Sequence, residues 1–122
     1  MSRVYIAGPI TNGCTVIDDK KIMPNIRKAM DAAWVLIDNG HNPFVPQLSY
    51  FMHKHRYPNA KSWADQKEWD MWLTNDHEWI RLCDCLLRLP GKSKGADNEI
   101  EFANRIEIPV YYSVKKLLSK ES

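Results

Sequence analysis

The stretch from Ser93 to Ala103, which reads SKGADNEIEFA, restricts most strongly what this chain can fold into. It follows an apolar run at residues 85–89 and a Pro-Gly turn, and it precedes a second β-type run at residues 108–112. This order predicts a strand, a loop of small residues, a helix and a further strand, which is the repeating unit of a parallel α/β sheet. Ligands bind such sheets at the carboxyl ends of the strands, and a helix N-terminus there favours anionic groups. We therefore expect a ligand site in the loop before the helix.

One carboxylate on the predicted helix falls on its apolar side. Glu99, Phe102, Ala103 and Ile106 share a helix face by their spacing, so Glu99 lies on an otherwise apolar stripe. Glu101, in contrast, belongs to the opposite and exposed side of the helix. A carboxylate on an apolar face is costly unless it is paired or used. Either the Glu99 carboxylate lies there because it interacts favourably with the positive end of the helix dipole, or Glu99 is a functional group. Both interpretations stay open.

A second acid shows the same pattern. The sequence predicts one helix over residues 62–83, with Ser62 as its N-cap. Asp76 falls inside the apolar stripe of this helix, which is formed by Trp69, Trp72, Leu73, Trp79, Ile80 and Cys83. Asp76 either caps a helix break at residues 74–75, because Thr and Asn are poor helix-interior residues, or is a buried acid that faces the same cleft as Glu99.

The N-terminal region predicts a second loop at the edge of the sheet. A β-type run at residues 3–7 ends in a glycine loop at residues 8–13, which is followed by a helix from residue 23 or 24 to residue 38, with Pro24 in its first turn. A further strand is expected at residues 43–46. The loop matches neither the dinucleotide-binding fingerprint nor the P-loop. It remains a candidate ligand loop because it follows a strand.

Three groups of residues, in order along the chain, carry a resemblance to a known family. They are VYIAGPIT at residues 4–11, the pair Asn75-Asp76 with Cys83-Asp84 before a strand, and Ser93, Gly95, Glu99 and Ala103 in the last motif. The chain resembles the nucleoside 2-deoxyribosyltransferase-like superfamily, close to a small group with a GPIT start and an SKGA end. We accordingly expect residues 1–122 to form a single domain with a flavodoxin-like three-layer α/β fold. Its sheet should be mostly parallel and have four or five strands, with strands near residues 3–7, 43–46, 85–89 and 110–112.

The resemblance implies catalytic roles for three residues. Glu99 matches the carboxylate nucleophile, which attacks C1′ of a ribose or deoxyribose and releases the base. Asp76 matches the acid that handles the proton on the departing base, and Tyr5 matches a tyrosine that orients the nucleophile. Retaining glycosyl transfer uses such a pair of carboxylates, of which the acid needs a raised pKa.

Ser93 bears on the kind of substrate. In the superfamily that the chain resembles, the nucleoside transferases have Asp at the matching position. The members that hydrolyse nucleotides have Ser there, which can bind a phosphate without charge repulsion. Lys92 and Lys94 flank Ser93 here. The expected substrate-binding residues are Gly8, Pro9, Ile10, Ser93, Gly95 and Ala96.

The implied function is cleavage of the N-glycosidic bond of a (deoxy)nucleoside 5′-monophosphate through a covalent glycosyl-enzyme intermediate. The reaction is either hydrolysis or base exchange, and two departures from the family pattern count against transferase activity more than against cleavage of the N-glycosidic bond. Ile100 and Glu101 stand where a glycine usually follows the nucleophile, and no residue clearly matches a C-terminal asparagine that a partner subunit contributes. The alternative is a non-catalytic nucleotide-binding or sensor module on the same fold, because fold alone does not determine function.

Composition restricts the partners. The 122 residues carry a formal net charge of +2, with no basic stripe typical of nucleic-acid binding. No signal peptide is expected, and no apolar stretch approaches the about 18 residues of a membrane helix. We expect a cytoplasmic protein that binds a small-molecule nucleotide or nucleoside, with no nucleic acid, no membrane, no cofactor and no metal. Cys14, Cys83 and Cys85 are expected to be free thiols, and a zinc site that includes His53 and His55 is a weak alternative.

Residues 47–61 mix aromatic and basic side chains and allow several interpretations. The segment could cover the site as a lid, stack on a base, line a dimer interface, or form a surface loop with two aromatic side chains. The chain also has five tryptophans, four of them between Trp63 and Trp79. Aromatic residues are enriched in interface cores, so we expect a homodimer or larger homo-oligomer with the Trp-rich helix at the contact.

Overall fold

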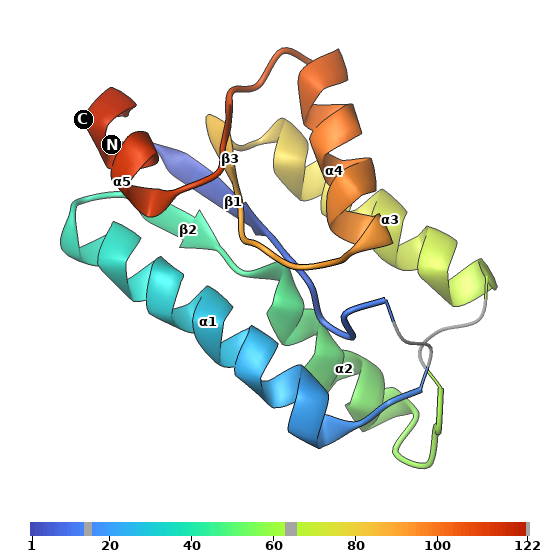
Figure 1. Ribbon diagram of the computed structural model, residues 1–122. Helices are drawn as coiled ribbons and strands as arrows, with labels where there is room; N and C mark the ends of the chain where they lie inside the picture. The colour runs from blue at the N-terminus through green and yellow to red at the C-terminus, as the bar shows by residue number, and fades with distance from the viewer. Residues whose placement is uncertain (14–15, 63–65, 122) are drawn as a thin grey trace.

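The structure is a computed structural model that describes residues 1–13, 16–62 and 66–121 (Figure 1). In these residues the sheet has four strands, which are β1 (Arg3–Ala7), β2 (Asn42–Phe44), β3 (Cys85–Arg88) and β4 (Val110–Tyr111). The order is β2-β1-β3-β4 and every pairing is parallel. This is the strand order with which a flavodoxin-like sheet begins. The predicted α/β fold and its strands are thus confirmed, with bounds that differ by one or two residues.

Helices cover both faces of the sheet and create three layers (Figure 1). One face packs against α1 (Asp19–Asp38) and α5 (Val114–Lys120), and the other against α3 (Gln66–Arg81) and α4 (Lys94–Arg105). The remaining helical segments are a short 3₁₀ turn, η1 (Pro46–Leu48), and α2 (Ser49–Arg56). The alternation of side chains along β1 assigns Val4 and Ile6 to the α1 face and Tyr5 to the α3 and α4 face.

Helix α1 begins earlier than the sequence predicts. Asp18 is its N-cap, and the Asp18 carboxylate accepts a hydrogen bond of 3.0 Å from the Lys20 backbone N–H. Pro24 therefore lies inside the helix and not in its first turn. An interior proline loses the hydrogen bond of its missing N–H and crowds the carbonyl one turn before it, but the capped turn before Pro24 still extends the helix toward the N-terminus.

Helix α3 is continuous through Thr74 and Asn75, so the predicted helix break is absent and Asp76 does not cap one. Packing of this amphipathic helix against α4 outweighs the weak helix propensity of those two residues. Ser62 pairs with Val16 in an isolated bridge and is not part of the helix. Trp79 is 44% exposed, although the sequence pattern assigned it to the apolar stripe of this helix. Its ring stacks on Phe44 at the edge strand β2, so it covers the margin of the core and is not enclosed by it.

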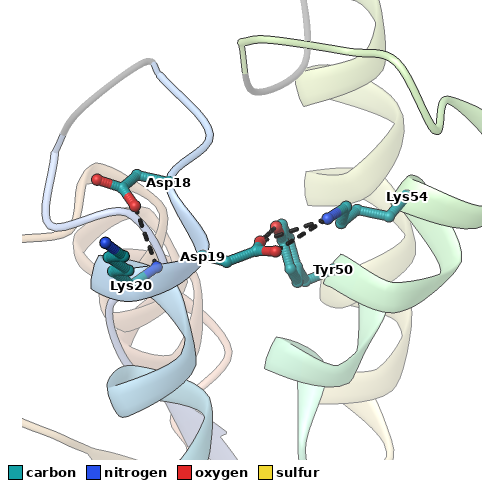
Figure 2. A network of polar contacts seen from close by, with 5 residues as sticks. All are labelled: Asp18, Asp19, Lys20, Tyr50 and Lys54. Atoms are coloured by element: carbon teal, nitrogen blue, oxygen red, sulfur yellow. Dashed lines mark hydrogen bonds and ion pairs between the residues drawn. The ribbon is translucent and has the colours of Figure 1, made fainter.

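The segment at residues 47–61 is largely helical, so the surface-loop interpretation is wrong. Tyr50 and His53, one turn apart on α2, are both buried. Asp19, at the start of α1, accepts hydrogen bonds from the Tyr50 hydroxyl and from Lys54 Nζ, the latter at 3.2 Å (Figure 2). On the other side, the Trp72 indole N–H donates to His53 Nδ1 at 3.3 Å. Helix α2 is thus tied to both α1 and α3.

Two of the three cysteines lie in the described part of the chain. Cys83 and Cys85 are free thiols, as predicted, and they pack on opposite faces of the sheet. Cys14 and Trp63 lie outside the described residues. In the part of the chain that the structure describes, no three His, Cys, Asp or Glu side chains are grouped to hold a metal ion, so His53 and His55 form no such site there. None of the described helices combines the length and apolarity that crossing a membrane requires.

Candidate active site

The centre of the site is a hydrogen bond between Tyr5 and Glu99. The Tyr5 hydroxyl donates to Glu99 Oε2, which joins the middle of β1 to the first half of α4. Tyr5 is fully buried and Glu99 is only 6% exposed. Burial, followed by the negative charges of Glu99 and Asp76, raises the pKa of Tyr5 well above its usual value, so the phenol remains protonated and acts as a donor. The carboxylate on the apolar stripe of α4 is therefore paired.

Asp76 completes a group of three ionisable side chains. It comes from α3, is half-buried, and lies close enough to Glu99 and Tyr5 for each of the three groups to affect the pKa of the others. Burial raises the pKa of Asp76 to about 6, although the hydrogen bonds to Glu99 and Tyr5 act in the opposite direction. Burial and the neighbouring Asp76 charge also raise the pKa of Glu99 well above its usual range, against the Tyr5 hydrogen bond and the charge of Arg88. The two acids titrate together, and their proximity favours a state in which they share a single proton.

Two loops meet beside this acid pair at the carboxyl edge of the sheet. Gly91 has a φ of +119°, and a Cβ there would lie 2.8 Å from Pro9 Cγ, so both the backbone and the close approach require glycine. In the same way a Cβ at Gly8 would lie 3.1 Å from Leu89 Cβ. The loop after β1 and the loop after β3 therefore pack directly on one another, and the Lys92 side chain lies along Gly13.

Ser93 lies at the junction between the second loop and α4. Its hydroxyl oxygen accepts a hydrogen bond of 3.0 Å from the Ala96 N–H, which makes Ser93 the N-cap of the helix. The hydroxyl proton is not used by this bond and can be donated to a ligand. Gly95 lies in the first turn, and a Cβ there would come within 3.4 Å of the Trp69 ring. Trp69 thus borders the helix N-terminus.

The sequence-predicted site residues fall into two groups in the structure. Tyr5 and Glu99 are joined by a hydrogen bond, and Asp76 lies beside them. The predicted binding residues form the adjoining loops, and they are Gly8, Pro9, Ile10, Ser93, Gly95 and Ala96. The Ile10 carbonyl is held by Asn25 Nδ2 at 2.9 Å, which fixes the first loop to α1.

Sequence reasoning missed two polar residues at this edge. Arg88, the last residue of β3, is buried and hydrogen bonds with the loop carbonyls. Gln47, in the 3₁₀ turn after β2, is almost fully buried and donates to the Ile6 carbonyl at 3.0 Å. Its Oε1 atom has no hydrogen-bond partner in the described part of the protein and is an available buried acceptor. A charge within the apolar run at residues 85–89 was a usable signal for Arg88, whereas no local pattern singles out Gln47.

Comparison with known proteins relates the chain to others at the level of fold. Neither a protein-family model nor a curated protein sequence matches it. Among solved structures, it is similar to a 2-deoxyribosyltransferase from the psychrotolerant bacterium Bacillus psychrosaccharolyticus, described as a suitable biocatalyst for nucleoside synthesis. The TM-score is 0.56 at 20% sequence identity, and the match covers 88% of this chain and 69% of the other. The two proteins share their fold.

Proposed function

We propose that the protein cleaves the N-glycosidic bond of a (deoxy)nucleoside 5′-monophosphate through a covalent glycosyl-enzyme intermediate. The observation that carries this proposal is the buried contact among Tyr5, Asp76 and Glu99 at the carboxyl edge of a parallel sheet. A module that only binds nucleotides has no need to bury two interacting carboxyl groups, because such burial destabilises the fold. The fold shared with a 2-deoxyribosyltransferase supports the same reaction class.

In the proposed first step Glu99 is the nucleophile and Asp76 the general acid. A Glu99 carboxylate oxygen forms a bond to C1′ while the bond from C1′ to the base nitrogen breaks, and the Asp76 proton passes to the departing base. The Tyr5 hydroxyl holds the nucleophile by the hydrogen bond already present in the free protein. Because this step needs one ionised and one protonated carboxyl group, a single shared proton is the state that it requires.

In the second step an acceptor attacks C1′ and releases Glu99. Asp76, now ionised, removes a proton from the acceptor, so both acids return to their initial states. Water as acceptor gives hydrolysis, and a second base gives base exchange. The Gln47 side chain lies beside Gly8, and its Oε1 atom, which has no partner among the described residues, can accept a hydrogen bond from a bound ligand on the β2 side.

The substrate is proposed to bind with its 5′-phosphate at the start of α4. Ser93 can donate its hydroxyl proton, and the first backbone N–H groups of the helix are oriented toward the same position. Lys92 and Lys94 are exposed on either side and can add charge-assisted contacts. A phosphate held there would also keep C1′ close to Glu99.

The assembly and location proposed from the sequence accompany this function. We propose a single domain over residues 1–122 that forms a cytoplasmic homodimer or larger homo-oligomer through α3. The exposed Met71 and Trp79 on that helix support such a contact. Light scattering of wild type and of Trp79→Lys tests it, because a contact centred on α3 would give a smaller particle in the variant.

The reaction is tested by incubating the protein with a panel of ribo- and deoxyribonucleoside monophosphates and separating free base by chromatography. Base release by the wild type, and none by Glu99→Gln, is the expected result. Protection of the protein against thermal unfolding by a nucleotide that it never cleaves would instead support the nucleotide-binding module.

A further inference from the structure

Arg88 occupies an unusual place for an arginine, at the buried end of a central strand. It pairs with Ala7 across β3 and β1, and strand alternation directs it to the same face as Leu86 and Tyr5. Its residue exposure is 9%. Arginine is rarely buried unless its guanidinium is fully used, because removing the charge from water is costly.

The guanidinium is used mainly to hold the loop that leads to Ser93. Nη1 donates to the Leu89 carbonyl, and Nη2 donates to the Gly91 carbonyl at 2.8 Å. Nη2 also lies 3.3 Å from Asp97 Oδ1 in the first turn of α4. A single side chain therefore fixes the end of β3, the Gly91 turn that contacts Pro9, and the start of α4.

The positive charge of Arg88 is only partly balanced by its ion pair. The Asp97 side chain is 72% exposed, so solvent weakens its interaction with the guanidinium. The loop carbonyls are neutral. Arg88 lies on the sheet face of Tyr5, which binds Glu99, and it contacts α4 at Asp97, two residues before Glu99. Its charge therefore acts on the buried acid pair and lowers the pKa of Glu99, against the effect of burial.

We propose that Arg88 is a positioning residue for Glu99, which fixes the loop between β3 and α4 and presents a buried positive charge to the Glu99 carboxylate. Because this inference deepens the proposed function, it rests on that function. Its consequence is that the charge of Arg88 opposes the burial that raises the pKa of Glu99, and so favours the ionised form of the nucleophile. The residue is outside the three motifs that the sequence presents, and it acts through Glu99 and not on the substrate.

The test compares three variants with the wild type. Arg88→Met removes the charge and keeps most of the side-chain volume, Arg88→Lys keeps the charge but loses the forked contacts to the loop, and Asp97→Asn removes the exposed counter-charge. Urea unfolding first establishes that each variant is folded. The ionisation of Glu99 is then followed without substrate by ¹³C NMR of glutamate carboxyl groups, with the Glu99 signal assigned by its loss in Glu99→Gln.

Arg88→Met should raise the midpoint of the Glu99 titration by about one pH unit. In Arg88→Lys, which keeps the charge, the midpoint should stay close to the wild-type value. Asp97→Asn should move it slightly in the opposite direction. In the base-release assay the acidic limb should shift with the NMR midpoint, and Arg88→Lys should still have a lower kcat because the loop is less well fixed. A purely structural role would change the free energy of unfolding but leave the midpoint in place.

An unchanged midpoint in folded Arg88→Met overturns the inference, and so does a higher midpoint in Asp97→Asn, which remains measurable if Arg88→Met does not fold. The NMR titration needs no turnover. Failure of base release in the wild type, with the expected midpoint shifts, would therefore contradict the proposed function and leave the electrostatic role of Arg88 standing.

Discussion

His77 Nε2 lies 2.7 Å from Asn98 Oδ1, and each of these residues is the sequence neighbour of one of the two acids. His77 follows Asp76 on α3, and Asn98 precedes Glu99 on α4. The amide oxygen accepts, so the imidazole carries its proton on Nε2. The His77 ring also stacks on Phe102, with centroids 4.0 Å apart and an interplanar angle of 7°. The two helices are thus tied together beside the acid pair.

Replacing His77 by Ala should separate the acids as well as weaken helix packing. We expect the free energy of unfolding to fall by about 1–2 kcal/mol, because a hydrogen bond and a ring contact are lost, and kcat to fall about tenfold or more. Asn98→Ala should reproduce the catalytic effect without the loss of stacking. Urea unfolding and base-release assays measure the two effects separately. Unchanged kcat in Asn98→Ala would limit the pair to a structural role.

Glu99→Gln should abolish base release while the fold persists. The amide keeps the shape and can still accept from Tyr5, but it cannot form the ester with C1′, so we expect a loss of at least about 10³-fold. Glu101→Gln is the matched control, because Glu101 is exposed on the same helix and forms an ion pair with Arg105. Circular dichroism verifies the fold. Loss of activity in Glu101→Gln with retention in Glu99→Gln would show that the wrong carboxylate was chosen.

Glu99→Gln should also change the pH dependence of stability. Because the pKa of Glu99 is raised in the folded protein, the folded state binds more protons than the unfolded state above the ordinary glutamate pKa. Wild-type stability should therefore decrease as the pH rises above the ordinary glutamate pKa, whereas the variant lacks this contribution. We expect the variant to gain stability relative to wild type across this range, by about 1 kcal/mol or more. Equal pH dependence of the two proteins in urea unfolding would contradict the burial of an ionisable Glu99.

Asp76→Asn should alter the alkaline side of the pH–rate profile. A general acid must be protonated to act, so with a pKa of about 6 the wild-type rate should fall as the pH rises through that region. The variant cannot donate in this way, and its profile should be lower and flat there. Substrates whose leaving groups need no proton should lose less activity. Asp70→Asn is a suitable control, since Asp70 is an exposed acid of the same helix. A wild-type profile in Asp76→Asn would assign Asp76 to folding and not to proton transfer.

Removing the 5′-phosphate of the substrate should lower kcat as well as raise KM, because the phosphate contact also positions C1′. Ser93→Asp should lower kcat/KM for the nucleotide more than for the parent nucleoside. Asp can still cap α4, but its negative charge repels a phosphate. Steady-state kinetics with each substrate pair on both proteins measure the effect. Equal kcat/KM for nucleotide and nucleoside on the wild type would move the proposal toward a nucleoside enzyme.

The sequence by itself determined the layered α/β fold and singled out both acids. Apolar runs at residues 3–7 and 85–89, separated by helical periodicity, are local patterns that report burial, and the strands follow them closely. Glu99 and Asp76 stood out because each interrupts an apolar helical stripe. Periodicity alone did not decide the segments where packing competes with propensity. Of the alternatives left open there, the structure excludes the helix break at residues 74–75 and the surface loop at residues 47–61.

Only the tertiary structure decided which groups meet. Tyr5 and Glu99 are 94 positions apart, and no local pattern encodes a contact over such a separation. The same holds for the bond between His77 and Asn98, which forms because α3 and α4 pack on the same face of the sheet. Arg88 and Asp97 meet for a related reason: parallel pairing of β3 with β1 aligns their carboxyl ends beside the start of α4. Local sequence sets the burial of each side chain, whereas its chemical partners depend on strand order and register.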